Sequence, residues 1–171
     1  LSMSGVRPTL LGYALSHREI WTEQKWIGPD ARPPVASAIS DLRPWKGLGD
    51  LLAALEKVKS RRSDLQARIF SWTVRPATIP DWIDWRTGVA RPELAASIAA
   101  TSLFVSASWA ESFGLPPLEV MAAGVPVVVT DSRGGREYAR HLDNCLVTPP
   151  KDSDALAAAI DRLLGDRDLM L

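Results

Sequence analysis

The sequence has little sulfur and no excess of charge of either sign. Its 171 residues include one cysteine, Cys145, so no disulfide can form within the chain, which is typical of a reducing compartment. Lys+Arg and Asp+Glu both number 20, so the formal net charge is zero. Nucleic-acid binders usually carry a basic excess, and membrane-surface patches need runs of one sign. We therefore predict a cytoplasmic protein that does not bind nucleic acid, with Cys145 as a buried, inert thiol.

Long apolar runs, a signal peptide and metal-ligand spacings are missing as well. The longest uncharged stretch, residues 94–110, is shorter than the roughly 20 residues of a membrane span, and we expect a helix running into a strand there. His17 and His141 are too far apart in sequence to form a ligand motif, and we interpret both as surface or structural residues. Asp81 and Asp84 lie in a tryptophan-rich loop and are expected to face solvent. We predict no required metal.

Strand and helix patterns alternate from Val35 onward. Apolar residues spaced three or four apart over residues 48–62 predict an amphipathic helix. Strands are expected at 35–40, 65–72, 82–85, 102–108, 125–130 and 144–150. Further helices are expected at 92–100, 116–124, 135–140 and 152–166, the last with Asp152 or Ser153 as N-cap. Continuous apolar strands are typical of a parallel sheet covered on both faces, so the sequence predicts a doubly wound, Rossmann-like α/β domain over 35–171. Residues 1–34 have no clear period and are interpreted as a linker or N-terminal extension.

The stretch ESFGLPPLEVMAAGVPVVVTD contains the most informative pattern. Glu111 and Glu119 stand on either side of a Gly-Leu-Pro-Pro break, directly before a buried strand. Gly114 lets a ligand approach the backbone, and the N–H groups of Gly114 and Leu115 lie at a helix start, which favours an anion. Carboxylates suit sugar hydroxyls, because each accepts from two O–H groups. Two glutamates beside an anion site fit a nucleotide-sugar, which has hydroxyls on both sides of its diphosphate.

Other interpretations of the two glutamates remain open at this point. Glu111 can be a solvated loop residue, and Glu119 a charge that complements the helix dipole. A glycosidase would use two carboxylates as acid and nucleophile. A non-catalytic doubly wound nucleotide-binding or interaction module, or a nucleotide-sugar epimerase, would also fit the predicted fold.

The same stretch resembles the signature of the group 1, family 4 glycosyltransferases of GT-B fold, usually E-G-F-G-L-P-x-L-E-A-M-A-x-G-x-P-V-V. Ser112 and Val120 replace the usual Gly and Ala. KGLGDLLAAL, GGREY and NCLVTPPKDSDALAAAIDRLLGD also resemble parts of the family. The likeness covers roughly residues 35–168.

The resemblance implies a role for each matching residue. Glu111 would contact the donor sugar, Glu119 would bind the ribose hydroxyls, and Lys46 would grip the diphosphate and stabilise the charge on the leaving group. Glu111 and Lys46 are thus the candidate catalytic residues. The candidate donor-binding set is Arg43, Lys46, Ser112, Phe113, Gly114, Leu115 and Glu119.

Two departures from the family pattern stand out. Ser40-Asp41 occupies the place of a Gly-Arg pair whose arginine also binds diphosphate, and Arg43 is the nearby candidate to replace it. The turn FSWTVRPATIPDW lacks the usual glycines, so we expect an unusual wall around the nucleobase. For the tryptophans nearest these loops, packing is favoured over ligand stacking: Trp45, Trp82, Trp85 and Trp109.

The resemblance also implies an activity and a domain arrangement. Family members transfer a sugar with retention from a nucleotide-sugar to an acceptor, often in bacterial polysaccharide or lipopolysaccharide assembly, without a cofactor. A C-terminal domain binds the donor, and an N-terminal domain binds an acceptor glycan or lipid-linked sugar. This chain resembles the donor domain alone, with the acceptor domain absent. We expect it to bind donor without efficient transfer, and the full-length enzyme to associate peripherally with membranes.

Overall fold

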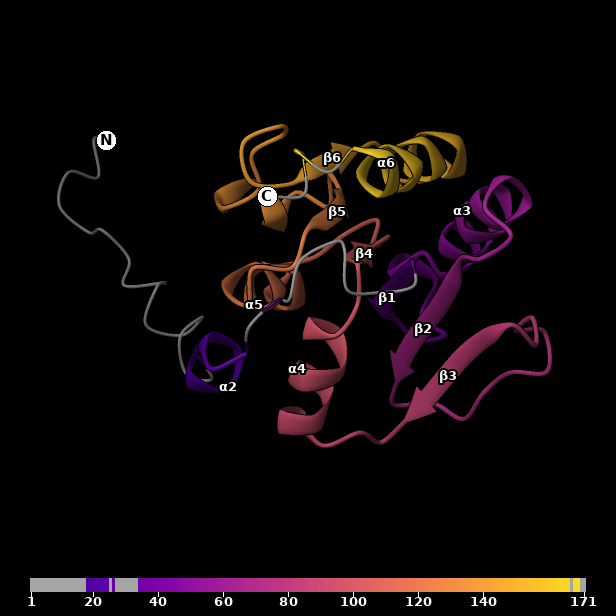
Figure 1. The fold of residues 1–171 in the computed structure, drawn as a ribbon, viewed down its shortest axis with the longest axis horizontal. Coiled ribbons are helices and arrows are strands. Elements are labelled where there is room, and N and C mark those ends of the chain that lie inside the picture. The colour runs from indigo at the N-terminus through magenta and orange to yellow at the C-terminus, as the bar shows by residue number, and fades with distance from the viewer. Residues whose placement is uncertain (1–17, 25, 27–33, 167, 170–171) are drawn as a thin grey trace, which may run out of the picture.

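The computed structural model describes residues 18–24, 26, 34–166 and 168–169. Its centre is a six-stranded sheet in the order β3-β2-β1-β4-β5-β6 (Figure 1), and every pair of neighbours is parallel. The strands are β1 Val35–Ile39, β2 Gln66–Ser71, β3 Ile83–Thr87, β4 Leu103–Ser106, β5 Val127–Thr130 and β6 Leu146–Thr148. The order along the sheet reverses direction between β1 and β4. Such a switch point opens a crevice at the carboxyl ends of the two strands.

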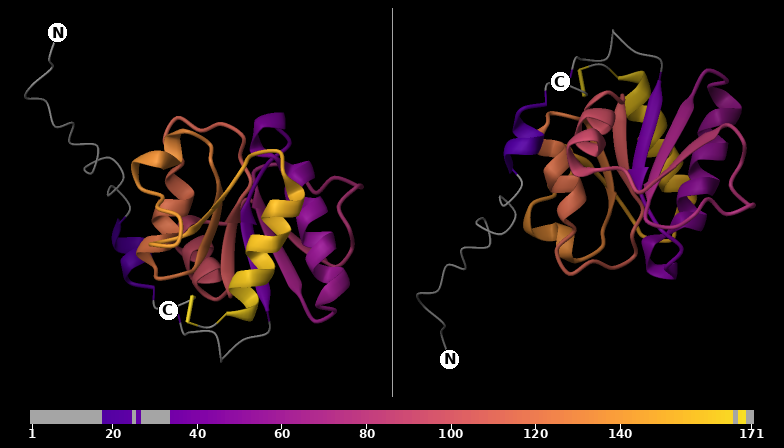
Figure 2. Two further views of the ribbon diagram at one scale, coloured as in Figure 1. Left: turned by 90° about the horizontal axis from the view of Figure 1, so that it is seen from above. Right: turned by 90° about the horizontal axis from the view of Figure 1, so that it is seen from below.

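Helices cover both faces of the sheet (Figure 2), which confirms the doubly wound prediction. The helices are α2 Arg18–Thr22, α3 Leu48–Arg61, α4 Arg91–Ala99, α5 Leu115–Ala122 and α6 Ser153–Gly165, with short 3-10 turns η2 Pro44–Lys46 and η3 Gly134–Glu137. One core cluster joins the sheet to α3 and α6, and the other joins it to α2, α4 and α5. The helix expected over 135–140 is thus the 3-10 turn η3.

The sequence pattern explains these layers. Leu51, Leu55 and Val58 are buried on the inner side of α3, as their spacing predicts. Phe104 and Val105 are consecutive residues of β4, so they point to opposite faces, and each is only 1% exposed. The continuous apolar run is therefore explained by burial on both faces. Asp152 is the N-cap of α6, and its carboxylate accepts from the amide of Ala155 at 2.8 Å.

Residues upstream of Val35 also pack onto the domain. Trp21 in α2 is 4% exposed and belongs to the core cluster with α4 and α5. The indole N–H of Trp26 donates to the carbonyl of Thr101 at 3.1 Å. The described part of the predicted linker or extension is therefore a packed extension. His17 lies outside the described residues.

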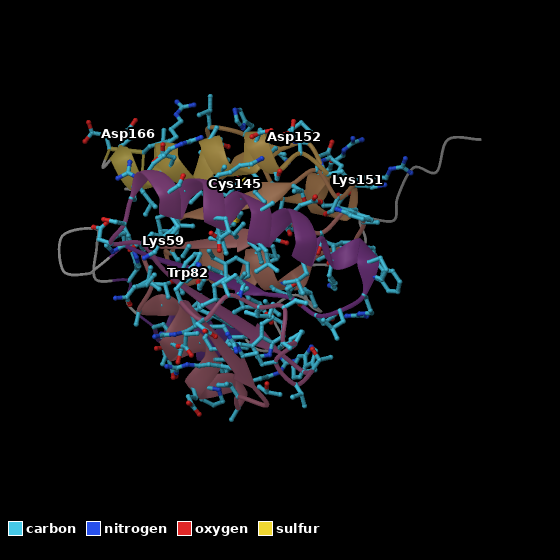
Figure 3. All side chains as sticks on the ribbon, turned by 90° about the vertical axis from the view of Figure 1, so that its right-hand side faces the viewer. Lys59, Trp82, Cys145, Lys151, Asp152 and Asp166 are labelled. Carbon is cyan, nitrogen blue, oxygen red and sulfur yellow. The ribbon has the colours of Figure 1, made fainter. Side chains whose placement is uncertain are left out.

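The structure also shows the surroundings of the cysteine, of one histidine and of the tryptophan-rich loop. Cys145, labelled in Figure 3, is buried, and burial raises the pKa of its thiol. His141 has a structural role, because its Nδ1 accepts from the amide of Val147. Trp82 is partly buried and packs against the core cluster, and Lys59 Nζ lies 5.2 Å from its ring centre (Figure 3). Asp84 pairs with two arginines, and the described residues contain no cluster of three metal-ligating side chains.

Candidate functional site

Two loops meet at the switch point of the sheet. One follows β1 and covers residues 40–47, and the other follows β4 and covers residues 107–114. Gly47 has φ 63°, and a Cβ on it would lie 2.0 Å from the carbonyl oxygen of Ala107, so only glycine fits this approach. The amide of Trp109 donates to the carbonyl of Trp45 at 2.7 Å. These contacts hold the two loops side by side.

The paired loops bring Lys46 and Glu111 together. Lys46 Nζ donates to Glu111 Oε1 at 2.6 Å, and about one-fifth of each side chain is exposed. An ion pair in such partly buried surroundings is screened less than one on the open surface. The structure thus brings the two candidate catalytic residues into direct contact as an ion pair.

A pocket of about 430 Å³ opens beside this pair. Of the residues proposed from the sequence, it is lined by Arg43, Lys46, Glu111, Leu115 and Glu119. The other three, Ser112, Phe113 and Gly114, lie next to Glu111 in the chain but are not part of the pocket lining.

The segment 111–114 is supported from behind by the turn that follows β5. A Cβ on Gly134 would lie 2.4 Å from the carbonyl oxygen of Glu111, so the two backbones touch. The Phe113 ring packs on Tyr138 with 5.5 Å between ring centres, and the Tyr138 hydroxyl donates to the carbonyl of Gly114. Burial raises the pKa of this hydroxyl, so it stays a donor at neutral pH. This support fixes the direction in which Glu111 leaves the backbone.

The N-terminus of α5 forms another part of the pocket wall. Gly114 is its N-cap with φ 79°, and no side chain caps the helix. Pro116 and Pro117 have no N–H, so among the first three helical residues only Leu115, which lines the pocket, has an amide to offer a ligand. The positive end of the helix dipole favours an anion at this wall.

Asp41 stands where the family resemblance predicts an arginine, and it organises Arg43. Its carboxylate accepts from Arg43 Nη2 at 2.6 Å, from Nε at 2.9 Å and from the Arg43 amide at 2.9 Å. These bonds hold the pKa of the Asp41 carboxyl below its usual value. The Arg43 side chain remains 53% exposed and lines the pocket. Asp41 therefore fixes the guanidinium in place and also offsets its charge.

Comparison with known proteins decides the family. The family model described as glycosyl transferases group 1 matches residues 33–166. The chain belongs to this family. A GDP-mannose-dependent alpha-(1-6)-phosphatidylinositol monomannoside mannosyltransferase from Mycobacterium tuberculosis is 32% identical over 152 residues, covering 79% of this chain and 39% of that protein. This chain thus spans well under half the length of that relative.

Solved structures agree with the group 1 assignment at the level of the fold. The C-terminal domain of a group 1 glycosyl transferase (LpcC) from Francisella tularensis superposes with a TM-score of 0.70 at 23% identity, covering 90% of this chain and 84% of that one. HepE from Anabaena, solved in complex with UDP-glucose, superposes with a TM-score of 0.71 at 24% identity. The match covers 82% of this chain and 41% of the HepE chain. This group 1 glycosyltransferase chain thus has the Rossmann-like fold of one GT-B half.

The pocket of this group 1 domain includes residues that were not singled out from the sequence. Trp21 comes from α2, and Arg91 from the first turn of α4, where its guanidinium lies 4.0 Å from Glu119. Trp72, directly after β2, is 69% exposed. Trp72 lies in the turn that lacks the glycines usual in the family. This departure was the sequence feature that could have identified Trp72 as a site residue. Nothing in the irregular sequence before Val35 identified Trp21.

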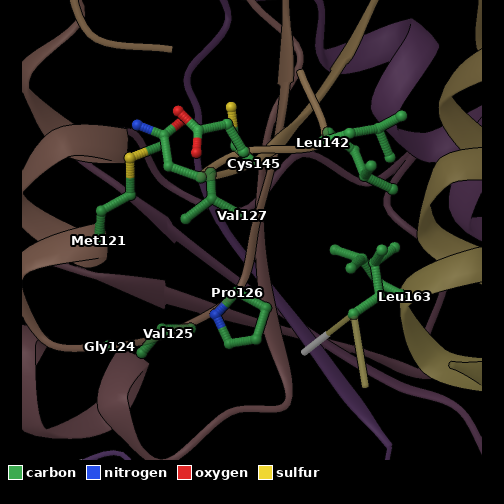
Figure 4. Close-up of a pocket in the computed structure, with 12 residues that line it drawn as sticks. Met121, Gly124, Val125, Pro126, Val127, Leu142, Cys145 and Leu163 are labelled. Carbon is green, nitrogen blue, oxygen red and sulfur yellow. The ribbon is translucent and has the colours of Figure 1, made fainter. Parts of the chain in front are cut away.

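A second pocket of about 250 Å³ lies at the amino-terminal ends of β5 and β6, and Figure 4 shows the residues that line it. It is lined mainly by apolar side chains such as Met121, Val127 and Leu163, together with Cys145. Because parallel α/β sheets bind ligands at the carboxyl ends of their strands, the pocket at the switch point is the candidate site. Within the described ranges, no helix has the length and apolar character needed to cross a membrane.

Proposed function

We propose that this chain is the nucleotide-sugar-binding half of a two-domain glycosyltransferase. The observation that carries the proposal is the meeting of Lys46, Glu111, Glu119 and the α5 N-terminus in one pocket at the switch point. A cation and a helix start suit a diphosphate, and carboxylates on either side suit the hydroxyls of the sugar and the ribose.

In this proposal each group has a part in the transfer. Lys46 binds the diphosphate and stabilises the negative charge that develops on it as the bond to the sugar breaks. Glu111 contacts the donor sugar, and Glu119 accepts from the ribose hydroxyls. Because protein cations and a helix N-terminus supply the positive charge, we propose that neither a metal nor a cofactor is needed. The transfer would retain the configuration of the sugar, as the family resemblance implies.

The acceptor side of the reaction is also part of the proposal. An acceptor glycan or lipid-linked sugar would be held by an N-terminal domain, in bacterial polysaccharide or lipopolysaccharide assembly. The full-length enzyme would work in the cytoplasm and associate peripherally with the membrane. The 171-residue chain would bind donor but transfer little, so a clear transfer rate from it alone would contradict this arrangement.

Thermal shifts with nucleotides test the proposal directly. The chain would be heated with GDP, UDP, dTDP and ADP in turn, and GDP comes first because the Mycobacterium tuberculosis relative depends on GDP-mannose. A ligand at a hundred times its dissociation constant stabilises a protein by about 2.7 kcal/mol. We expect a shift with one nucleotide that is lost in Glu119→Ala. No shift with any of the four would contradict the proposed function.

A further inference from the structure

Trp72 is an exposed aromatic side chain in an unusual place. It follows the last residue of β2, so it lies at the same carboxyl edge of the sheet as Lys46 and Glu111. Its side chain lines the 430 Å³ pocket although the residue is 69% exposed. Leaving an indole in water forfeits the burial that usually stabilises a tryptophan. This makes the indole a candidate contact for a ligand.

The backbone around Trp72 is held in place by hydrogen bonds from both sides. The Ser71 and Thr73 hydroxyls lie 2.9 Å apart, and the Thr73 amide donates to Ser71 Oγ at 3.2 Å. From β3, the indole N–H of Trp85 and the hydroxyl of Thr87 both donate to the Thr73 carbonyl, at 3.0 and 3.1 Å. The exposed ring is therefore presented by a fixed loop, which reduces the ordering entropy that binding requires.

The position along the sheet edge identifies the part of the ligand that would meet Trp72. Glu111 follows β4 and Trp72 follows β2, with β1 between them. Neighbouring strands are about 4.8 Å apart, so the two loops are roughly 10 Å apart along the edge. If Glu111 contacts the sugar, a diphosphate at Lys46 and a ribose at Glu119 leave the base as the group that reaches the β2 end.

We propose that Trp72 is the stacking platform for the nucleobase of the donor. This inference rests on the proposed function and adds a residue that determines how the base is held. Every base has a flat π-face, so an indole binds it by stacking, without needing a particular hydrogen-bonding edge. The indole thus takes the place of the glycine turn that the family pattern predicts at this wall.

Isothermal titration calorimetry on the 171-residue chain separates the base from the phosphates. The probes are the nucleotide that gives the thermal shift and inorganic pyrophosphate, which has no base. In Trp72→Ala we expect the affinity for the nucleotide to fall roughly fivefold to a hundredfold, the range of base–aromatic stacking. Affinity for pyrophosphate stays unchanged. Trp72→Phe, which keeps an aromatic face, recovers most of the nucleotide affinity.

Val74→Ala is the matched control, because Val74 is 82% exposed in the same loop and does not line the pocket. It should leave both affinities unchanged. Nucleotide affinity that survives Trp72→Ala but is lost in Glu119→Ala would overturn the stacking proposal while the proposed function stands. Equal loss of nucleotide and pyrophosphate would overturn it too, because the effect would then not involve the base. A wild-type chain that binds no nucleotide would remove both proposals together.

Discussion

Lys46 Nζ lies 2.6 Å from Glu111 Oε1, although 65 positions separate the two residues in the chain. The cation proposed for the diphosphate is therefore neutralised by the carboxylate proposed for the sugar before any ligand arrives. In the proposed function, a bound diphosphate would compete with Glu111 for the same ammonium group. Binding of the phosphates would thus release the carboxylate toward the sugar, which links the two ends of the site.

This competition predicts opposite effects of two substitutions on pyrophosphate affinity. Lys46→Met removes the cation and should weaken binding about tenfold or more, the loss expected for a hydrogen bond to a charged group. Glu111→Gln frees Lys46 and should strengthen binding by roughly 1 kcal/mol, about fivefold. Calorimetric titration with pyrophosphate measures both. Weaker binding in Glu111→Gln would show that the ion pair does not compete with the ligand.

Gly134 should be far less replaceable than Gly49. A Cβ on Gly134 would lie 2.4 Å from Glu111 O and 2.6 Å from the carbonyl carbon of Ser112, and backbone atoms cannot easily move away. Gly134→Ala should therefore lower the free energy of unfolding by about 1–3 kcal/mol and weaken nucleotide binding, because the Glu111 loop shifts.

Gly49→Ala is the control for this pair. Gly49 is helical in α3 and a Cβ there meets nothing within 4 Å, so alanine should stabilise the chain by up to about 1 kcal/mol. Urea unfolding of both variants gives the comparison. Equal effects of the two substitutions would mean that the close approach behind Glu111 is not tight.

The sequence predicted the elements because their signals are local. The leucine spacing of α3, the apolar runs of β4 and β5, and the Asp152 cap each act within a few residues of their position. The family-like stretch also predicted Glu111, Glu119 and the helix start between them.

What the sequence did not predict depends on contacts between distant segments. The Lys46–Glu111 pair requires β1 and β4 to be neighbours, which the strand order decides. The need for glycine at Gly134 comes from a backbone more than twenty residues earlier in the chain. Trp21 belongs to a helix of five residues, and it is buried in a core cluster with residues of α4, α5 and the sheet.

Two buried serines of similar exposure should respond with opposite signs to alanine. Ser40 is 3% exposed, and its hydroxyl has no hydrogen-bond partner in the described part of the chain. Ser40→Ala should raise the free energy of unfolding by roughly 1 kcal/mol, because an unpartnered hydroxyl is costly to bury.

Ser37 is 1% exposed, but its hydroxyl lies 2.8 Å from Thr101 Oγ1 and donates to the carbonyl of Leu103. Ser37→Ala should therefore lower the free energy of unfolding by about 1–3 kcal/mol. Denaturant titrations of the free chain measure both values. Destabilisation by Ser40→Ala would imply that its hydroxyl has a partner in solution.

Asp41 should contribute to stability in a pH-dependent way. The side-chain hydrogen bonds from Arg43 hold the Asp41 pKa below the ordinary value of 3.8, so the folded state favours the ionised form. A carboxyl with a lowered folded pKa stabilises the fold above its unfolded pKa, and this contribution is lost as the pH falls through the folded value. The stability difference between wild type and Asp41→Asn should be constant above about pH 5 and should shrink below pH 3.8.

Urea unfolding of wild type and Asp41→Asn between pH 3 and pH 7 measures this difference. Because the other carboxyl groups titrate in both proteins, the subtraction isolates Asp41. If the difference in free energy of unfolding between the two proteins does not change with pH, the Arg43 contact does not favour the charged carboxylate.

The pocket begins earlier in the chain than the sheet does, because Trp21 lines the pocket and precedes the first strand, β1. The six strands in the described part of the chain lie after Pro34, so a shortened protein that begins at Val35 retains each of them and the helices that follow. The same cut removes Trp21 from the pocket lining and from the core cluster that contains residues of α4 and α5. The segment that contains every described strand and the segment that contains every residue of the pocket lining are therefore different lengths of this sequence.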